Sequence, residues 1–384
     1  MATTSDWDIA SKRVVITGST SGIGRETAAQ LAAQGAHVVL ACRNLPLAEQ
    51  VAADIRRQHL GATVEVGPQL DLASLESIRQ FAAAYKRSGQ PLHVLINNAG
   101  MLTLAGTNYQ RPWQTPEGVG GLCQVNYLGP YALTRLLEDT LQQSAPARVV
   151  NLSSVTHRFG WLGDVARFLP SWVPGSYYPS TKLANVLFAN EMQRRLGEHG
   201  VQSCAVDPGG VASKIWDHSA FAKPPLSWVI NNLYAPTSDG AAAVVHAATV
   251  PWGRERLAAA AINQRWSQPP GSRSRRNAAR PLPDLRFYAR GLFTSPLVTS
   301  WRGIPQRGFR SRVRQTVWGL STLAHSLLDW PLRRLSGGRI LAQTRCVPSA
   351  PLSYDSTLAA QLWDLSADAA QLPRDCKLVG KAKR

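Results

Sequence analysis

The sequence predicts an α/β fold in which a doubly wound parallel sheet is covered by helices on both faces. Over the first 250 residues, short runs rich in β-branched side chains alternate with longer segments of helical periodicity. The strand-like runs are apolar at nearly every position, as expected where both faces of a strand are buried. The length of 384 residues and the hydrophobic content of 44% suit a single domain that carries an appendage.

The predicted strands and helices follow one another in a regular order. Apolar runs predict six strands, at 13–16, 37–40, 62–66, 92–96, 148–152 and 201–206. The first helix follows a Gly-rich turn, and further helical periodicity covers 46–59, 74–87, 117–143, 177–198 and 238–249. After an interruption, 337–342 predicts a last strand and 358–365 a closing helix. We therefore expect one domain that comprises residues 10–250 and 337–372.

The interruption, residues 251–336, carries most of the positive charge. It contributes +13 to the formal net charge of +18, through 16 arginines, no lysine and three acidic residues. Because it shows no strand–helix alternation, we interpret it as an Arg-rich insertion before the last strand. An apolar stripe at 313–327, with arginines beside it, predicts a helix that either packs on the domain or lies on an anionic membrane surface. A disordered segment or translated non-coding sequence is the third alternative.

Composition and patterning exclude several classes of protein. No run approaches about 18 apolar residues and the N-terminus lacks an apolar signal region, so we expect neither a transmembrane helix nor a secretory signal. The five cysteines show no metal-binding or disulfide spacing, which favours reduced thiols and no metal site. No nucleic-acid partner is expected, because the positive charge is local and no binding module accompanies it. These observations favour a cytoplasmic protein or one at the periphery of a membrane.

A Gly-rich turn at 17–24 joins the first strand to the first helix. Glycines at such a turn let backbone N–H groups approach a pyrophosphate, and the N-terminus of the following helix adds a favourable field. The alternative is an ordinary turn that closes a βα unit. The residues expected to line the pyrophosphate are Gly18, Ser19, Ser21, Gly22, Ile23 and Gly24.

Arg43 follows the second strand, where NAD-binding proteins usually place an acid that binds the ribose hydroxyls. No Asp or Glu occurs between Glu26 and Glu49, and an arginine suits a 2′-phosphate, with Arg25 as a second cation. The pattern therefore favours NADP as cofactor, with NAD as the alternative. A solvated surface arginine is the other interpretation of Arg43.

Polar and small residues follow the third and fourth strands. Asp71 comes after the third strand, and Asn98, Ala99 and Gly100 come after the fourth. Ligands of open α/β sheets bind outside the carboxyl ends of the strands. We therefore expect these four residues at the cofactor site.

Tyr178 and Lys182 are spaced so that a helix places both on one face. A free tyrosine is a poor base at neutral pH, but a neighbouring cation favours the phenolate and makes proton exchange feasible. Tyr177 lies five positions from Lys182 and does not share this face. Such a spacing also occurs by chance, so the pair alone is weak support for catalysis.

Two further motifs are compatible with a site. Ser153 and Ser154 follow the fifth strand, where a hydroxyl can donate to a substrate carbonyl or simply cap a turn. Asn126 lies within a long helical pattern that it does not favour, which indicates a local role or a solvated side chain.

In this order and at these intervals, the motifs resemble those of the short-chain dehydrogenase/reductase family. The resemblance covers roughly 10–250 and 337–370 and implies a Rossmann-type fold. Several strings are similar to the retinol-dehydrogenase-like branch, which includes WW-domain oxidoreductase relatives. They are ACRN (41–44), PLHVLINNAG (91–100), NYLG (126–129), DPGGV (207–211) and LSYDSTLAAQLWDLS (352–366).

The resemblance implies roles for these residues. Tyr178 is the general acid/base, Lys182 lowers its pKa and holds the nicotinamide ribose, and Ser154 orients the substrate oxygen. Asn126 supports a proton-relay water, and Asp71 lies near the adenine. Asn98 packs near the cofactor ribose, and Pro208 and Gly209 flank the nicotinamide. The remaining cofactor-binding residues are Ala99, Gly100, Val211 and Ser213. Ser213 stands where the family commonly has threonine, and it keeps the hydroxyl.

The implied reaction is hydride transfer between nicotinamide and an apolar alcohol, aldehyde or ketone, similar to retinol or a polyprenol. Residues 212–235 correspond to the substrate loop of the family. The apolar residues of this loop either form the substrate wall or close the core: Ile215, Trp216, Phe221, Leu226, Trp228, Val229, Ile230 and Leu233. Homodimers and homotetramers are common in the family. The alternative function is a catalytically silent Rossmann-type module that docks on a membrane or a partner through 251–336.

Overall fold

The computed structural model of the chain describes its residues in ten ranges. They are 7–102, 114–162, 165–170, 177–217, 223–224, 226–251, 286–290, 344–346, 351–376 and 378–379. Within these ranges, no helix combines the length and the apolar character that a bilayer span requires.

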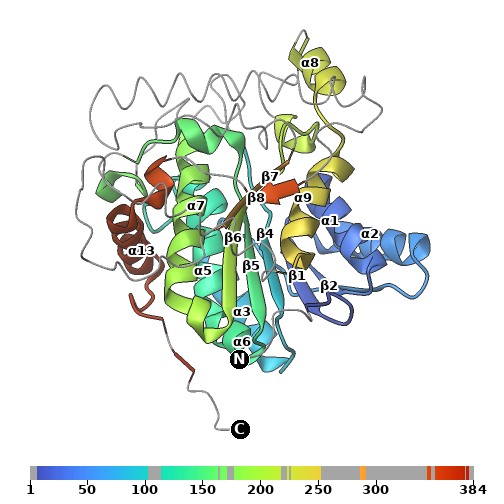
Figure 1. The fold of residues 1–384 in the computed structure, drawn as a ribbon, viewed down its shortest axis with the longest axis horizontal. Coiled ribbons are helices and arrows are strands. Elements are labelled where there is room, and N and C mark those ends of the chain that lie inside the picture. The colour runs from blue at the N-terminus through green and yellow to red at the C-terminus, as the bar shows by residue number, and fades with distance from the viewer. Residues whose placement is uncertain are drawn as a thin grey trace, which may run out of the picture.

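One sheet forms the centre of the molecule, with the strand order β3-β2-β1-β4-β5-β6-β7-β8 (Figure 1). Its first six strands are parallel: β1 (Arg13–Thr17), β2 (His37–Ala41), β3 (Thr63–Val66), β4 (Val94–Asn97), β5 (Ala147–Leu152) and β6 (Val201–Asp207). Each starts and ends within two residues of its predicted range. The chain moves outward from β1 to β3, then returns to β4 and continues to β6, which is the doubly wound order. The predicted fold class is confirmed.

Helices cover both faces of this sheet (Figure 1). One face carries α1 (Gly22–Ala33), α2 (Leu45–Gln58) and α9 (Thr237–Thr249), and the other carries α3 (Leu75–Arg87), α5 (Gly129–Leu136) and α7 (Tyr177–Leu196). Alternate strand residues point to opposite faces, so Val14 and Ile16 pack in one buried cluster while Val15 packs in the other. Burial on both faces explains why the strands are apolar throughout.

The helix predicted at 117–143 is divided. It consists of α4 (Gly121–Cys123), a π-helical turn (Gln124–Leu128), α5 and α6 (Glu138–Gln143). At the start of α5, a Cβ on Gly129 would lie 2.7 Å from the main-chain oxygen of Leu72, so the close approach of these segments needs a glycine. The periodicity that predicts one helix does not reveal such a local change of hydrogen bonding.

The far edge of the sheet corrects the sequence interpretation. β7 (Arg286–Arg290) pairs in parallel with β6, and β8 (Thr344–Cys346) pairs antiparallel with β7. β7 lies inside 251–336, so these five residues belong to the sheet rather than to an insertion before the last strand. β7 occupies the edge of β6 that does not pair with β5. The composition of the segment does not reveal this pairing. The predicted strand at 337–342 and the apolar stripe at 313–327 lie outside the described residues.

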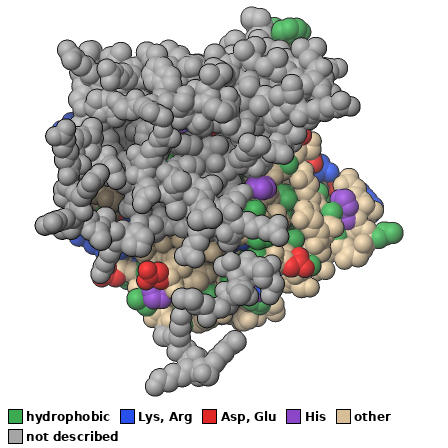
Figure 2. Space-filling view, viewed as in Figure 1, with side chains coloured by type: hydrophobic (Ala, Val, Ile, Leu, Met, Phe, Trp, Pro, Cys, Tyr) green, Lys and Arg blue, Asp and Glu red, His purple; other side chains and the backbone are tan. Residues whose placement is uncertain are grey.

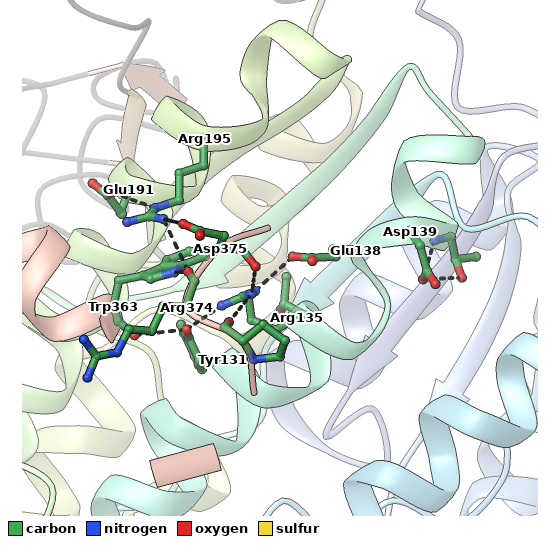
Figure 3. A network of polar contacts seen from close by, with 12 residues as sticks. Tyr131, Arg135, Glu138, Asp139, Glu191, Arg195, Trp363, Arg374 and Asp375 are labelled. Atoms are coloured by element: carbon green, nitrogen blue, oxygen red, sulfur yellow. Dashed lines mark hydrogen bonds and ion pairs between the residues drawn. The ribbon is translucent and has the colours of Figure 1, made fainter. Parts of the chain in front are cut away.

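A C-terminal helix, α13 (Ser356–Ala370), packs against α7 and α5 and confirms the predicted closing helix (Figure 1). Trp363 is 1% exposed, and its ring lies between the guanidinium groups of Arg135 and Arg195, at 4.5 and 4.6 Å from the ring centroid (Figure 3). Sixteen of the 20 residues of α7 are buried.

Candidate active site

The Gly-rich turn has the backbone conformation that its glycines predict. Gly18 and Gly22 have φ values of +65° and +56°, in the left-handed region that disfavours other residues. A Cβ on Gly24 would lie 2.4 Å from Asn98 Nδ2 and 2.5 Å from the Gly18 carbonyl oxygen. Asn98 Nδ2 donates to the main-chain oxygens of Thr17 and Gly18, at 2.8 and 3.2 Å. The asparagine after β4 thus holds the turn in shape.

Two observations fit this turn to the diphosphate of a dinucleotide. The turn opens α1, whose first residues present backbone N–H groups at the carboxyl end of β1. The Ser19 side chain is fully buried, and its Oγ has no hydrogen-bond partner among the described residues. An orphaned buried hydroxyl is costly unless a ligand supplies its partner. Ala99 supports the same turn, because its N–H donates to Thr17 Oγ1 at 3.0 Å.

The adenosine side of the candidate site is formed by the ends of β2 and β3. Arg43 is exposed, and its main-chain oxygen accepts from Gln69 Nε2 at 2.9 Å, which ties the two strand ends together. Asp71 accepts from the Ala73 N–H at 2.9 Å. Arg25, considered as a second cation, forms an ion pair with Asp54 at 3.2 Å. Arg57 forms an ion pair with the same aspartate.

Asn126 lies in the middle of the π-helical turn. Its side chain forms two hydrogen bonds with Met101: Oδ1 accepts from the Met101 N–H at 2.8 Å and Nδ2 donates to the Met101 oxygen at 2.9 Å. Its main-chain oxygen accepts from Asn185 Nδ2 at 3.0 Å. The asparagine that disfavours a regular helix therefore joins α7, the π-helical turn and the segment after β4.

Tyr178 and Lys182 lie one turn apart on α7, as predicted. The Lys182 ammonium lies 5.5 Å from the centroid of the Tyr178 ring. A Cβ on Gly100 would lie 3.4 Å from both Lys182 Nζ and Asn126 Oδ1, so these two polar groups flank Gly100. The fold therefore gathers these residues, from three separate segments, at the carboxyl ends of β4 and β5.

The two hydroxyls after β5 have different partners. Ser153 is buried, and its Oγ donates to the main-chain oxygen of Lys182 at 2.9 Å. Ser154 is only half-buried and accepts from the Thr156 N–H at 3.3 Å. A hydrogen bond with the Ser154 side chain also lowers the pKa of Tyr178. Ser154 is therefore the hydroxyl on the catalytic side, and Ser153 is structural.

Burial controls the protonation of this pair. It raises the pKa of Tyr178, and the charge of Asp207 raises it further, against the hydrogen bond from Ser154. Burial lowers the pKa of Lys182 to about 8, and Asp207 opposes that change. The resemblance implies that Lys182 lowers the pKa of Tyr178. Burial and the charge of Asp207 instead hold this pKa above its ordinary value.

The segment after β6 lies over the Gly-rich turn. Gly209 has a φ of +84°, and its N–H donates to Asp207 Oδ1 at 3.0 Å. Val211 is 4% exposed, and the Ser213 Cβ lies 3.6 Å from where a Cβ on Gly22 would be. Ala212 and Ser213 therefore lie across from Thr20, Ser21 and Gly22 of the turn.

A cavity of about 610 Å³ lies between this segment and the start of α1. Of the predicted substrate wall, Trp216 and Ile230 line it, and Ile23 packs beside the same segment. Trp228, on α8 (Leu226–Leu233), is 62% exposed, and Figure 2 shows hydrophobic surface protruding where α8 lies. Most of the cavity's lining is polar or charged, including Ser21, Ser213, Lys214 and Asp217. Phe221 lies outside the described residues.

Sequence reasoning missed three residues at the site. Asn185, three positions after Lys182, donates to the main-chain oxygens of Asn126 and Leu152, at 3.0 and 3.1 Å. Its position on the same helix face was a usable signal. Arg158 and Asp207 are both buried, and the charge of Asp207 raises the pKa of Tyr178 and of Lys182. An acid at the end of an otherwise apolar strand was the available signal for Asp207.

The family follows from comparison with known proteins. The model of the short chain dehydrogenase family matches residues 12–222, and the chain belongs to this family of oxidoreductases. The human WW domain-containing oxidoreductase is 40% identical over 255 residues, which are 64% of this chain and 59% of the relative. Mouse retinol dehydrogenase 12 is 39% identical over 251 residues, which cover 64% of this chain and 75% of that enzyme. The predicted branch is confirmed, and the chain spans less than two thirds of the WW-domain relative.

Solved structures agree on the fold. An uncharacterized protein from Mycobacterium paratuberculosis has a TM-score of 0.58 and 25% identity, covering 98% of this chain and 99% of that one. The L-sorbose reductase of Gluconobacter frateurii, complexed with NADPH and L-sorbose, has a TM-score of 0.51 and 20% identity, covering 64% of this chain and 92% of the reductase. At that identity the second likeness concerns the fold alone.

Proposed function

We propose that the protein is an NADP-preferring oxidoreductase that transfers a hydride between nicotinamide and an apolar alcohol, aldehyde or ketone. The observation that carries this proposal is the convergence of Asn126, Ser154, Tyr178 and Lys182 at the carboxyl ends of β4 and β5. A module that only docks on other molecules has no need of these four groups together.

The chain's own residues supply proton handling and orientation. Tyr178 donates its phenolic proton to the substrate oxygen during reduction and accepts it during oxidation. Ser154, hydrogen-bonded to Tyr178, orients that oxygen. Lys182 stabilises the phenolate, and Asn126 fixes α7 against the segment after β4. The nicotinamide, when bound, supplies or accepts the hydride.

The fit of a dinucleotide rests on the turn at 17–24. Its glycines leave room for a diphosphate, and the buried Ser19 hydroxyl requires a partner. NADP rather than NAD is supported by the exposed Arg43 and by the absence of acids between Glu26 and Glu49.

An apolar substrate is supported by the relatives and by the loop after β6. Mouse retinol dehydrogenase 12 shares 39% identity with the chain, and the substrate in its name, retinol, is an apolar alcohol. Trp216, Ile230 and Trp228 supply apolar surface near the site. We therefore propose retinol or a similar isoprenoid alcohol as the substrate class.

The experiment compares wild type with Tyr178→Phe in NADP⁺-dependent oxidation of retinol. We expect the variant to lose turnover by a factor of at least about 100, since general acid–base catalysis contributes 10²–10⁴-fold. Its NADPH affinity, from quenching of tryptophan fluorescence, should stay near that of wild type. Tyr177→Phe is the matched control, because that hydroxyl donates to the Phe168 oxygen at 3.0 Å. Full activity of Tyr178→Phe would exclude the mechanism, and a folded wild type that bound neither cofactor would favour the docking module.

A further inference from the structure

The segment that carries Ser154 is attached to α7 by a serine that the mechanism does not use. Ser180 lies on the first turn of α7, between Tyr178 and Lys182, and is 4% exposed. Its Oγ accepts from the Trp161 N–H at 3.1 Å and donates to the Trp161 main-chain oxygen at 2.8 Å. One hydroxyl, acting as both acceptor and donor, therefore holds the main chain of Trp161 against α7.

The residue before Trp161 also packs directly on α7. A Cβ on Gly160 would lie 2.6 Å from the main-chain oxygen of Pro179 and 2.7 Å from Leu183 Cβ. Gly160 has a φ of −61° and a ψ of 140°, which any residue can adopt. The lack of space, rather than the backbone conformation, is therefore the reason for a glycine here.

The other end of the same segment is attached to α7 as well. Ser153 Oγ donates to the main-chain oxygen of Lys182 at 2.9 Å. The segment 153–161 is thus bound to Lys182 where it begins and to Ser180 where it ends. Ser154 lies between the two attachments, so its position relative to α7 depends on both.

Hydrogen bonds within the segment connect Ser154 with its far end. The Gly160 N–H donates to the His157 oxygen at 3.0 Å, and the His157 N–H donates to the Ser154 oxygen at 2.9 Å. His157 Nδ1 lies 2.6 Å from the same Ser154 oxygen, and since a carbonyl only accepts, Nδ1 carries a proton. Ser154 Oγ accepts from the Thr156 N–H at 3.3 Å, so its own O–H is available as a donor on the side of Tyr178.

We infer that Ser180 is a positioning residue of the active site, whose hydroxyl fixes Ser154 relative to Tyr178. This inference rests on the proposed catalytic function of Ser154 and Tyr178. Ser180 lies two positions from Tyr178, which is about 200° around an α-helix, so it acts through the Trp161 main chain and does not contact the substrate. Its contribution is alignment of the two hydroxyls that bind the substrate oxygen.

Ser180→Ala removes both hydrogen bonds to Trp161. In NADP⁺-dependent oxidation of retinol, we expect kcat to fall by roughly 10- to 100-fold, since a displacement of about 1 Å can cost 10²-fold. The NADPH affinity, from quenching of tryptophan fluorescence, should stay near that of wild type, because the turn at 17–24 is unchanged. Gly160→Ala is a second, independent variant: its Cβ pushes the segment away from α7 and should also lower kcat.

Ser144→Ala is the matched control. Ser144 Oγ also accepts from a main-chain N–H, that of Leu92, and donates to a main-chain oxygen, that of Thr140, both at 2.8 Å. These bonds lie near the start of β4, at the end of the sheet opposite the site. Ser144→Ala should therefore lower the urea midpoint about as much as Ser180→Ala and leave kcat unchanged.

A double-mutant cycle with Ser154 separates positioning from general destabilisation. If Ser180 acts through Ser154, Ser180→Ala should change kcat by less than about twofold in a protein that already carries Ser154→Ala. The same is expected of Gly160→Ala in that background. A merely structural role would lower kcat by the same factor whether or not Ser154 is present, and that result would overturn the inference.

A second readout needs no turnover. The Trp161 amide donates to Ser180 Oγ, so its hydrogen exchange should become roughly tenfold faster in Ser180→Ala and stay unchanged in Ser144→Ala. Unchanged exchange in Ser180→Ala would show that this serine does not hold the segment and would contradict its role. If exchange changes as expected but the wild type has no Tyr178-dependent turnover, the proposed function fails and the attachment of the segment to α7 stands.

Discussion

Lys182 Nζ donates a hydrogen bond to the main-chain oxygen of Leu152, 3.1 Å away at the carboxyl end of β5. Ser153 Oγ donates in return to the main-chain oxygen of Lys182 at 2.9 Å. Two hydrogen bonds therefore tie the catalytic turn of α7 to the neighbouring strand. Because neither bond involves a ligand, the ammonium that supports Tyr178 is held in position before cofactor and substrate bind.

Stability should rise with pH over the range in which Lys182 is neutral only in the folded protein. Burial lowers the pKa of Lys182 from 10.5 to about 8. Between these values the unfolded chain binds the additional proton, so the free energy of unfolding increases with pH. The contribution is smallest below pH 8, where Lys182 is protonated in both states. Urea unfolding at pH 7 to 10 measures this rise, and Lys182→Met should reduce it. An equal slope in the variant would contradict the assignment.

Arg43→Asp should lower the affinity for NADPH by at least about tenfold and change the affinity for NADH much less. The reason is that a charge-assisted hydrogen bond to a 2′-phosphate contributes about 1.5–3 kcal/mol, and an acid at this position repels the phosphate. Fluorescence titration with each cofactor gives the two dissociation constants. Arg87→Asp is the control, since Arg87 is exposed at the end of α3. Equal losses for both cofactors would remove Arg43 from the site.

Gly24→Ala should weaken binding of both cofactors strongly. The added Cβ would lie 2.5 Å from the backbone oxygen of Gly18, so the Gly-rich turn must shift away from the diphosphate position. Overpacking of this kind costs about 1–3 kcal/mol of stability. Thermal unfolding with and without NADPH separates the two effects, because the stabilisation by NADPH should be lost. A variant that NADPH still stabilises fully would show that the turn does not contact the cofactor.

Trp363→Ala should destabilise the protein by about 3–5 kcal/mol. Trp363 is 1% exposed, its ring meets Tyr131 edge-on at 5.3 Å, and its Nε1 donates to the Arg374 oxygen at 2.7 Å (Figure 3). The substitution removes the contact that holds α13 against α5 and α7. Trp228→Ala, at a side chain that is 62% exposed, should change stability by less than about 0.5 kcal/mol. Similar urea midpoints for the two variants would show that α13 adds little.

Most of the sheet could be predicted because local signals and tertiary environment agree. Most residues of the first six strands are buried and apolar, and Gly18 and Gly22 of the turn at 17–24 have conformations that only glycine adopts easily. The edge of the sheet could not be predicted in this way. β7 is a short segment within an Arg-rich composition, and it pairs in parallel with β6, which is distant in the sequence.

The sequence by itself determined the fold class, the Gly-rich turn and the Tyr178–Lys182 spacing, since each depends on residues close together along the chain. Only the tertiary structure decided which serine faces Tyr178, that Asn126 lies in a π-helical turn, and that Asp207 and Arg158 are buried. Hydrogen bonds and charge interactions act between atoms a few ångströms apart, whatever their distance in sequence. The partners of these residues are distant in the sequence, so only the folded chain brings them within reach of a hydrogen bond or a charge interaction.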